Sequence, residues 1–200
     1  DFDQIRLRAH GLWNAELQKI KIERGNRIDL ERFYTALYHA SLTPFLFCDA
    51  DSSFLGADGK SHDSPGFPNY TFFTLWDTYR ALHPLFTLIR QNRAEEMLKS
   101  MVLHATLRPD SLLPLWCLAS KNYFNMAGYS SAPVLAEAWA KGIRGFDANR
   151  AYNLLVKNTS DKGFGGHEEF LRIGYVPADS EKLNVPKTLE YAFCDWNIGK

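Results

Sequence analysis

The stretch 70–86, YTFFTLWDTYRALHPLF, sets two charged side chains among aromatic residues. If it is helical, Phe73, Asp77 and Arg80 share one face and Trp76 lies over Arg80, because residues three and four apart are neighbours on a helix. An Asp77–Arg80 ion pair on a solvated edge would stabilise the helix only slightly. The alternative is a pocket wall, on which both charged groups bind sugar hydroxyls and the indole covers an apolar ring face. Spacing alone leaves both interpretations open.

A second polar and aromatic cluster is TLEYAFCDW, residues 188–196. Glu190 and Cys194 are four residues apart, as are Tyr191 and Asp195, so a helix would place each pair on one face. An amphipathic helix with two solvated carboxylates explains the pattern equally well, because acidic side chains readily occupy exposed faces.

The acidic stretch 49–60, DADSSFLGADGK, invites comparison with a calcium-binding loop. It lacks the central glycine position and the terminal glutamate of an EF-hand, so that motif is excluded. His39 in FYTALYHA and His83 in RALHPL are predicted to be hydrogen-bonded structural residues rather than metal ligands or bases.

The three cysteines are widely spaced and show no metal-binding pattern such as CxxC. They are Cys48, Cys117 and Cys194. One disulfide with a free thiol and three unpaired buried thiols both fit this number, and the second arrangement is favoured.

The composition excludes several classes of protein. The 200 residues are 46% hydrophobic and 14% aromatic, which is ample for a packed core. Acidic and basic side chains balance at 23 each, so no basic surface predicts binding to nucleic acid. No apolar run approaches the roughly 20 residues of a membrane span, and no membrane span is predicted.

The hydrophobic periodicity is helical nearly throughout. Gly, Pro, Asp and Ser mark a loop or short hairpin over 49–69 and a loop over 161–184, and LLPLWCL at 112–118 is predicted to be extended. Asp29 or a neighbour, and Asp147, are predicted helix caps. The predicted helices are 5–25, 29–43, 70–89 with a kink or break at Pro84, 93–107, 132–143, 147–157 and 185–197.

Several of these stretches together resemble one family. The order in which they occur is typical of glycoside hydrolase family 92, and the resemblance extends from Trp13 to Trp196. The matching stretches are FYTALYHASLTPFLFCDADSSFLGADGK, YTFFTLWDTYRALHPLFTLI, LPLW, MAGYSS, AEAWAKGIRGFD, GYVPAD and KTLEYAFCDW.

The resemblance implies a fold and a function. Family members have an N-terminal β-sandwich and a C-terminal (α/α)6 toroid, so residues 1–200 are expected to be all-α and to form the first half of that toroid. Members are calcium-dependent, inverting exo-α-mannosidases and are commonly exported, which suggests a secreted or periplasmic protein. The implied partners are a mannose-containing glycan and the rest of the parent chain.

The resemblance also implies which part of the machinery this chain carries. Inversion requires one carboxylic acid and one carboxylate, roughly 6.5–9.5 Å apart. In the family these lie in a Glu-Gly-Asn stretch and a Gly-x-x-Asp segment, and neither pattern occurs here. The chain is therefore expected to contribute no catalytic residue and no calcium ligand. Its share would be the sugar-binding wall, made by Trp76, Asp77, Arg80, Trp116, Tyr129, Glu190 and Asp195.

Three positions depart from the family pattern. Ser130 stands where the family commonly has histidine, Pro186 where it has serine, and Cys194 where it has aspartate. Lost imidazole and carboxylate groups bear on specificity and activity. The alternative function is therefore a catalytically inactive carbohydrate-binding or structural remnant of the same fold.

Overall fold

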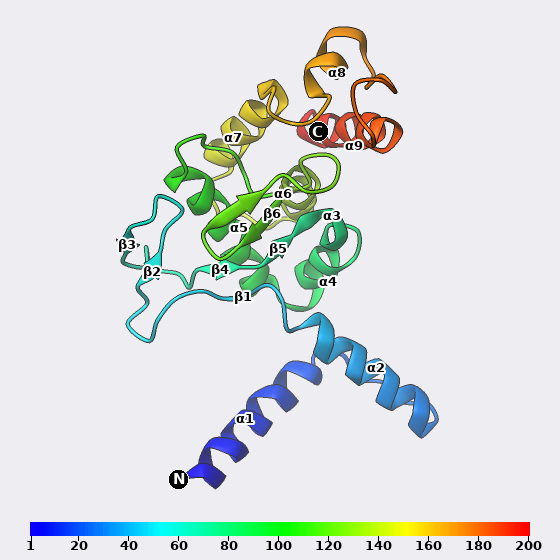
Figure 1. Ribbon diagram of the computed structural model, residues 1–200. Helices are drawn as coiled ribbons and strands as arrows, with labels where there is room; N and C mark the ends of the chain where they lie inside the picture. The colour runs from blue at the N-terminus through cyan, green and yellow to red at the C-terminus, as the bar shows by residue number, and fades with distance from the viewer. The chain divides into compact units, whose positions relative to one another are not determined.

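The computed structural model describes residues 1–200 and contains nine helices and seven short strands (Figure 1). The chain divides into two compact units, residues 1–43 and residues 44–200. Helices dominate, as predicted, but the expectation of an all-α chain is wrong because the second unit contains three small antiparallel sheets. The closed toroid stays a prediction.

The first unit consists of two helices, α1 (Phe2–Leu17) and α2 (Arg27–Ala40). The first helix ends well before the predicted Gly25. The cap of α2 is Asn26, whose side chain accepts a hydrogen bond of 3.0 Å from the backbone N–H of Asp29. The sequence predicted that Asp29 or a neighbouring residue caps this helix, and the cap is the neighbour, Asn26.

The second unit begins with paired strands. One sheet joins β1 to β4, a hairpin over the predicted loop joins β2 to β3, and the third sheet has the order β5-β6-β7. The strands are β1 (Phe45–Leu46), β2 (Phe54–Leu55), β3 (Ser61–His62), β4 (Tyr70–Thr71), β5 (Phe73–Thr74), β6 (Trp116–Leu118) and β7 (Lys121–Tyr123).

The predicted helix 70–89 is wrong over its first five residues. Strand β5 pairs with β6, so that Phe73 lies opposite Cys117 and is buried. Helical structure begins only at α3 (Leu75–Thr78), and α4 (Leu82–Ile89) follows after a break before the predicted Pro84. Pairing with a strand far along the chain outweighs the helical periodicity here, because short segments take their structure from their packing partners.

The remaining helices follow the prediction closely, with one addition. Asp147 caps α7 by accepting a 2.9 Å hydrogen bond from the backbone N–H of Arg150. The helix α8 (His167–Ile173) was not predicted and lies between Gly166 and Gly174, both with left-handed backbone. The predicted helices are α5 (Gln91–Leu107), α6 (Ser131–Ala140), α7 (Ala148–Ser160) and α9 (Asn184–Ile198).

The core of the second unit is formed by residues of α4, α5, α6, α7 and α9 together with residues of β5 and β6. Its members include Phe73, Leu75, Phe86, Met101, Leu113, Tyr129 and Tyr191. All three cysteines are free, as favoured; two are buried, but Cys48 is only half-buried. No helix combines the length and apolar character that crossing a membrane requires.

Candidate functional site

The first part of the site joins α9 to the residues that follow α3. The Arg80 guanidinium places Nη2 2.6 Å from Oε1 of Glu190, and its Nη1 donates a 2.7 Å hydrogen bond to the hydroxyl of Tyr79. That hydroxyl in turn donates to Oε2 of Glu190 at 3.1 Å. The three side chains form a closed ring of hydrogen bonds, called here the Arg80 network, which fixes the position of the cation.

Two aromatic rings lie against the same cation. The Arg80 guanidinium carbon lies 4.8 Å from the Trp76 ring centroid and 4.5 Å from the Tyr79 ring centroid, within the range of cation–π attraction. Trp76 also has a buried indole N–H without a hydrogen-bond partner. Such a donor is rare in folded proteins.

The charges in the Arg80 network reinforce one another. The hydrogen bond to Glu190 raises the pKa of the Arg80 guanidinium. Burial, followed by the negative charge of Glu190, raises the pKa of Tyr79 to about 12. Both groups therefore keep their protons at neutral pH, and Tyr79 remains a hydrogen-bond donor.

Asp77 lies outside the Arg80 network. Its side chain is exposed, and Arg80 forms its ion pair with Glu190 rather than with Asp77. The interpretation of the stretch as an intrahelical Asp77–Arg80 ion pair is therefore wrong. Phe73 does not share a helix face with either residue, because it belongs to β5.

The second part of the site is a buried tyrosine paired with a carboxylate. Tyr129 is fully buried, and its hydroxyl donates a hydrogen bond to Oδ1 of Asp195. Its ring stacks on Tyr191 with 5.8 Å between centroids. Burial, together with the Asp195 carboxylate, raises the pKa of Tyr129 far above its usual value, so this hydroxyl is a permanent donor.

Helix α9 carries both Glu190 and Asp195 and so joins the two parts of the site, and Gly128 in the loop before α6 lies close against it. The Gly128 backbone has a φ of +77°, and an added Cβ would lie 3.0 Å from Cβ of Glu190 and 3.3 Å from Sγ of Cys194. Only glycine combines this conformation with so close an approach. Helix α9 therefore carries Glu190 toward Arg80 and Asp195 toward Tyr129 while the loop before α6 rests against it.

Trp116 is placed beside this region without joining either hydrogen-bonded group. It is half-buried in β6, opposite Thr74, the residue that precedes α3. The structure thus brings Trp76, Arg80 and Glu190 together, and separately Tyr129 and Asp195. Tyr79 was not among the predicted sugar-binding residues, although it lies between Thr78 and Arg80 in the WDTYR motif.

The sequence matches the profile of the glycosyl hydrolase family 92 catalytic domain over residues 1–200, its whole length. The chain belongs to glycosyl hydrolase family 92. No match was found among curated protein sequences.

Solved structures of family 92 members superpose closely on this chain. The α-mannosidase BT3965 of Bacteroides thetaiotaomicron is 39% identical with a TM-score of 0.95, and the match covers 99% of this chain and 27% of that one. The same protein in complex with mannoimidazole gives a TM-score of 0.94 at 39% identity, covering 99% and 26%. The inverting mannosidase BT2199 from the same organism, strain VPI-5482, is 32% identical with a TM-score of 0.90, covering 99% and 28%. This chain thus spans about a quarter of these relatives' length.

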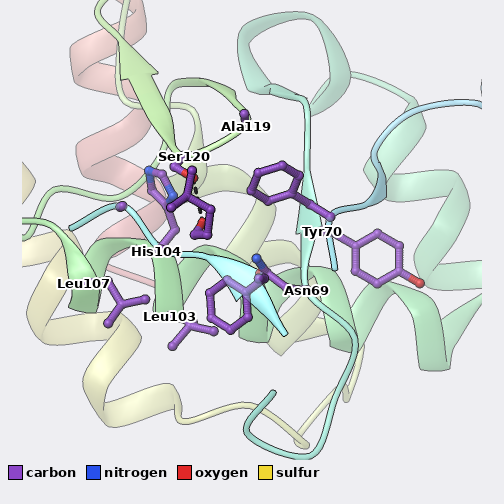
Figure 2. Close-up of a pocket in the computed structure, with 12 residues that line it drawn as sticks. Asn69, Tyr70, Leu103, His104, Leu107, Ala119 and Ser120 are labelled. Carbon is purple, nitrogen blue, oxygen red and sulfur yellow. Dashed lines mark hydrogen bonds between the residues drawn. The ribbon is translucent and has the colours of Figure 1, made fainter. Parts of the chain in front are cut away.

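A small cavity lies elsewhere in this family 92 chain, and Figure 2 shows its lining. Its volume is about 10 Å³, room for about one water molecule and far below the usual range of ligand pockets. Apolar and aromatic side chains dominate, with Asn69, His104 and Ser120 as polar members, and Ser120 donates a hydrogen bond to the Leu55 carbonyl. None of the predicted sugar-binding residues lines it, so the cavity is separate from the candidate site.

No three carboxylate, imidazole or thiol side chains come close enough together to hold a metal ion.

Proposed function

We propose that this chain forms part of the sugar-binding wall of an inverting, calcium-dependent exo-α-mannosidase that removes terminal α-linked mannose from glycans. The observation that carries the proposal is the family 92 match over the whole chain, combined with the Arg80 network. The relatives BT3965 and BT2199 are mannosidases, and BT3965 binds mannoimidazole.

The Arg80 network is suited to binding a sugar. A guanidinium has five N–H donors, and two are used here by Tyr79 and Glu190. With 45% of its side chain exposed, Arg80 can offer the remaining donors to ring hydroxyls. Trp76 adds an indole ring, and the exposed carboxylate of Asp77 can accept hydrogen bonds from the same hydroxyls.

In this proposal, the protein groups that move protons lie elsewhere in the full-length protein, as do the calcium ligands. The role of residues 1–200 is to bind and orient. The Arg80 guanidinium is already held by two aromatic rings and one carboxylate, so it need not rearrange when a sugar binds. Such preorganisation increases the affinity for the sugar.

Calorimetric titration of the full-length protein with an α-mannobiose tests the proposal, alongside hydrolysis assays with and without a chelator. We expect binding, hydrolysis that stops on chelation, and inversion detected by NMR of the released mannose. Arg80→Ala should weaken binding about tenfold, the loss expected for about 1.4 kcal/mol. Arg144→Ala is the matched control, because Arg144 stacks on Trp139 outside the candidate site.

Absence of any mannoside binding in the presence of calcium would overturn the proposal. Binding without hydrolysis would instead identify the protein as a non-catalytic carbohydrate-binding protein, the function that the altered Ser130 and Cys194 positions suggest.

A further inference from the structure

The loop DKGFGGH, residues 161–167, closes on itself beneath the second part of the site. The Asp161 carbonyl lies 2.6 Å from Nδ1 of His167, and the backbone N–H of His167 donates to the Phe164 carbonyl at 2.9 Å. Because a carbonyl oxygen can only accept, Nδ1 of His167 carries the proton. One side chain thus joins the two ends of the loop.

His167 then lies against the rings that support Asp195. It is fully buried, with its ring centroid 4.7 Å from that of Tyr191 and 5.7 Å from that of Tyr129. Phe164, from the same loop, lies 5.6 Å from Tyr129. Figure 1 shows α8, which His167 begins, beside α9.

The loop is also anchored directly to α9. The hydroxyl of Tyr191 donates a 2.9 Å hydrogen bond to the carbonyl of Gly165. Gly166 takes a φ of +72°, and an added Cβ there would lie 2.4 Å from Cγ1 of Val176, so the close turn into His167 requires glycine. The 165–167 end of the loop is therefore fixed against the helix that carries Asp195.

His167 leaves one polar atom unused. Its Nε2 is buried without a hydrogen-bond partner. Leaving a buried acceptor unpaired destabilises the fold, and a phenylalanine would avoid that penalty. The imidazole is explained by its Nδ1–H, which no aromatic hydrocarbon ring can supply while filling the same space between Tyr129 and Tyr191.

We infer that His167 is a positioning residue for sugar binding. By closing the 161–167 loop it holds the ring of Tyr129, and the hydroxyl of Tyr129 holds the Asp195 carboxylate in the orientation that receives a sugar hydroxyl. This inference rests on the proposed function, which assigns Asp195 to the sugar-binding wall.

A double-mutant cycle in the full-length protein tests the inference. The variants are His167→Asn, which can keep a donor to the Asp161 carbonyl but removes the ring, Tyr129→Phe, which removes only the hydroxyl, and their combination. The readout is the dissociation constant for an α-mannobiose, with the unfolding temperature measured separately. Residues that act through one another give non-additive effects, whereas independent residues give additive ones.

We expect His167→Asn to weaken binding about three- to tenfold alone and less than about twofold when Tyr129 is already phenylalanine, as coupled residues do. Phe146→Leu is the control, because it also trims a buried aromatic ring, but Phe146 packs on Trp139 outside the candidate site and should leave affinity unchanged. If His167→Asn does not fold, Phe164→Leu takes its place in the cycle.

Equal losses in both backgrounds would overturn the inference and make His167 a purely structural residue. If the wild-type protein binds no mannoside, the proposed function fails and the inference fails with it. If the wild type binds and the cycle is additive, only the inference is lost.

Discussion

At the residue scale, the site depends on one carboxylate that is already committed to protein partners. Both oxygens of Glu190 accept hydrogen bonds, one from Arg80 and the other from Tyr79. Its side chain is 14% exposed, against 45% for Arg80. Glu190 is therefore placed to orient the Arg80 guanidinium, and Arg80 is the more exposed group that can contact the ligand.

Glu190→Gln should therefore weaken mannoside binding without abolishing it. Glutamine keeps the shape but loses the charge that strengthens the hydrogen bond from Arg80. We expect affinity to fall about three- to tenfold, the equivalent of roughly 0.7–1.4 kcal/mol, measured by calorimetry on the full-length protein. Glu31→Gln, which breaks an exposed ion pair with Arg27, should leave affinity unchanged. An unchanged dissociation constant for Glu190→Gln would show that the pair does not orient Arg80 for binding.

Part of this site was predictable from the sequence. The family resemblance selected Arg80 and Glu190 individually, because each lies in a quoted motif. Their pairing was not predictable, since 110 residues separate them and helical periodicity reports only neighbours within one helix. The same rule pointed to Asp77, which Arg80 does not pair with.

At the scale of elements, the seating of α9 depends on the loop before α6. A Cβ added at Gly128 would lie 3.0 Å from Cβ of Glu190, a contact so tight that α9 would have to shift to accommodate it. The loop and the helix are far apart in sequence, so this contact could not be predicted. Nor could strands β4 and β5, because their pairing partners β1 and β6 set their structure.

Gly128→Ala should destabilise the protein by about 1–3 kcal/mol, through left-handed backbone strain together with the contact with α9. Gly174→Ala is the matched control, because Gly174 also has a left-handed backbone, at φ +83°, but nothing lies within 4 Å of its added Cβ. We expect the unfolding temperature to fall further for Gly128→Ala. Equal shifts for the two variants would show that the contact with α9 contributes nothing.

Helix α4 contains a buried histidine that makes stability depend on pH. His83 was predicted to be hydrogen-bonded, but its Nε2 has no partner, and the ring stacks on Phe73 with 6.5 Å between centroids. Burial lowers the pKa of His83 to about 4, from 6.5 for an exposed histidine. Between pH 6.5 and 4 the unfolded chain binds more protons than the folded one, so stability falls as pH falls through this window.

His83→Phe should remove its share of this dependence, because phenylalanine fills the same space and does not titrate. His83 contributes up to about 1.4 kcal/mol per pH unit within the window. We therefore expect the unfolding temperature of the variant to fall less than that of the wild type between pH 7 and pH 5. His104, whose pKa burial lowers to about 4, should supply the remaining dependence. Equal losses in both proteins would refute the assignment.

At the scale of the whole molecule, the second unit has a large apolar surface. Along α9, Val185, Leu189 and Trp196 are each more than half exposed, on the side of the helix opposite the buried Tyr191. A groove of about 530 Å³ lies between α6, α7 and the end of α9, with Trp139 and Tyr152 in its lining. Apolar surfaces of this kind are typical of faces that other protein segments cover.

The central claim is that the Arg80 network and its neighbours hold the terminal mannose. A crystal structure of the full-length protein with mannoimidazole, the ligand that BT3965 binds, tests it most directly. We predict hydrogen bonds of roughly 2.7–3.2 Å from the ligand hydroxyls to Arg80 or Asp77, with Trp76 against the ring. Mannoimidazole bound out of contact with all three residues would contradict the account.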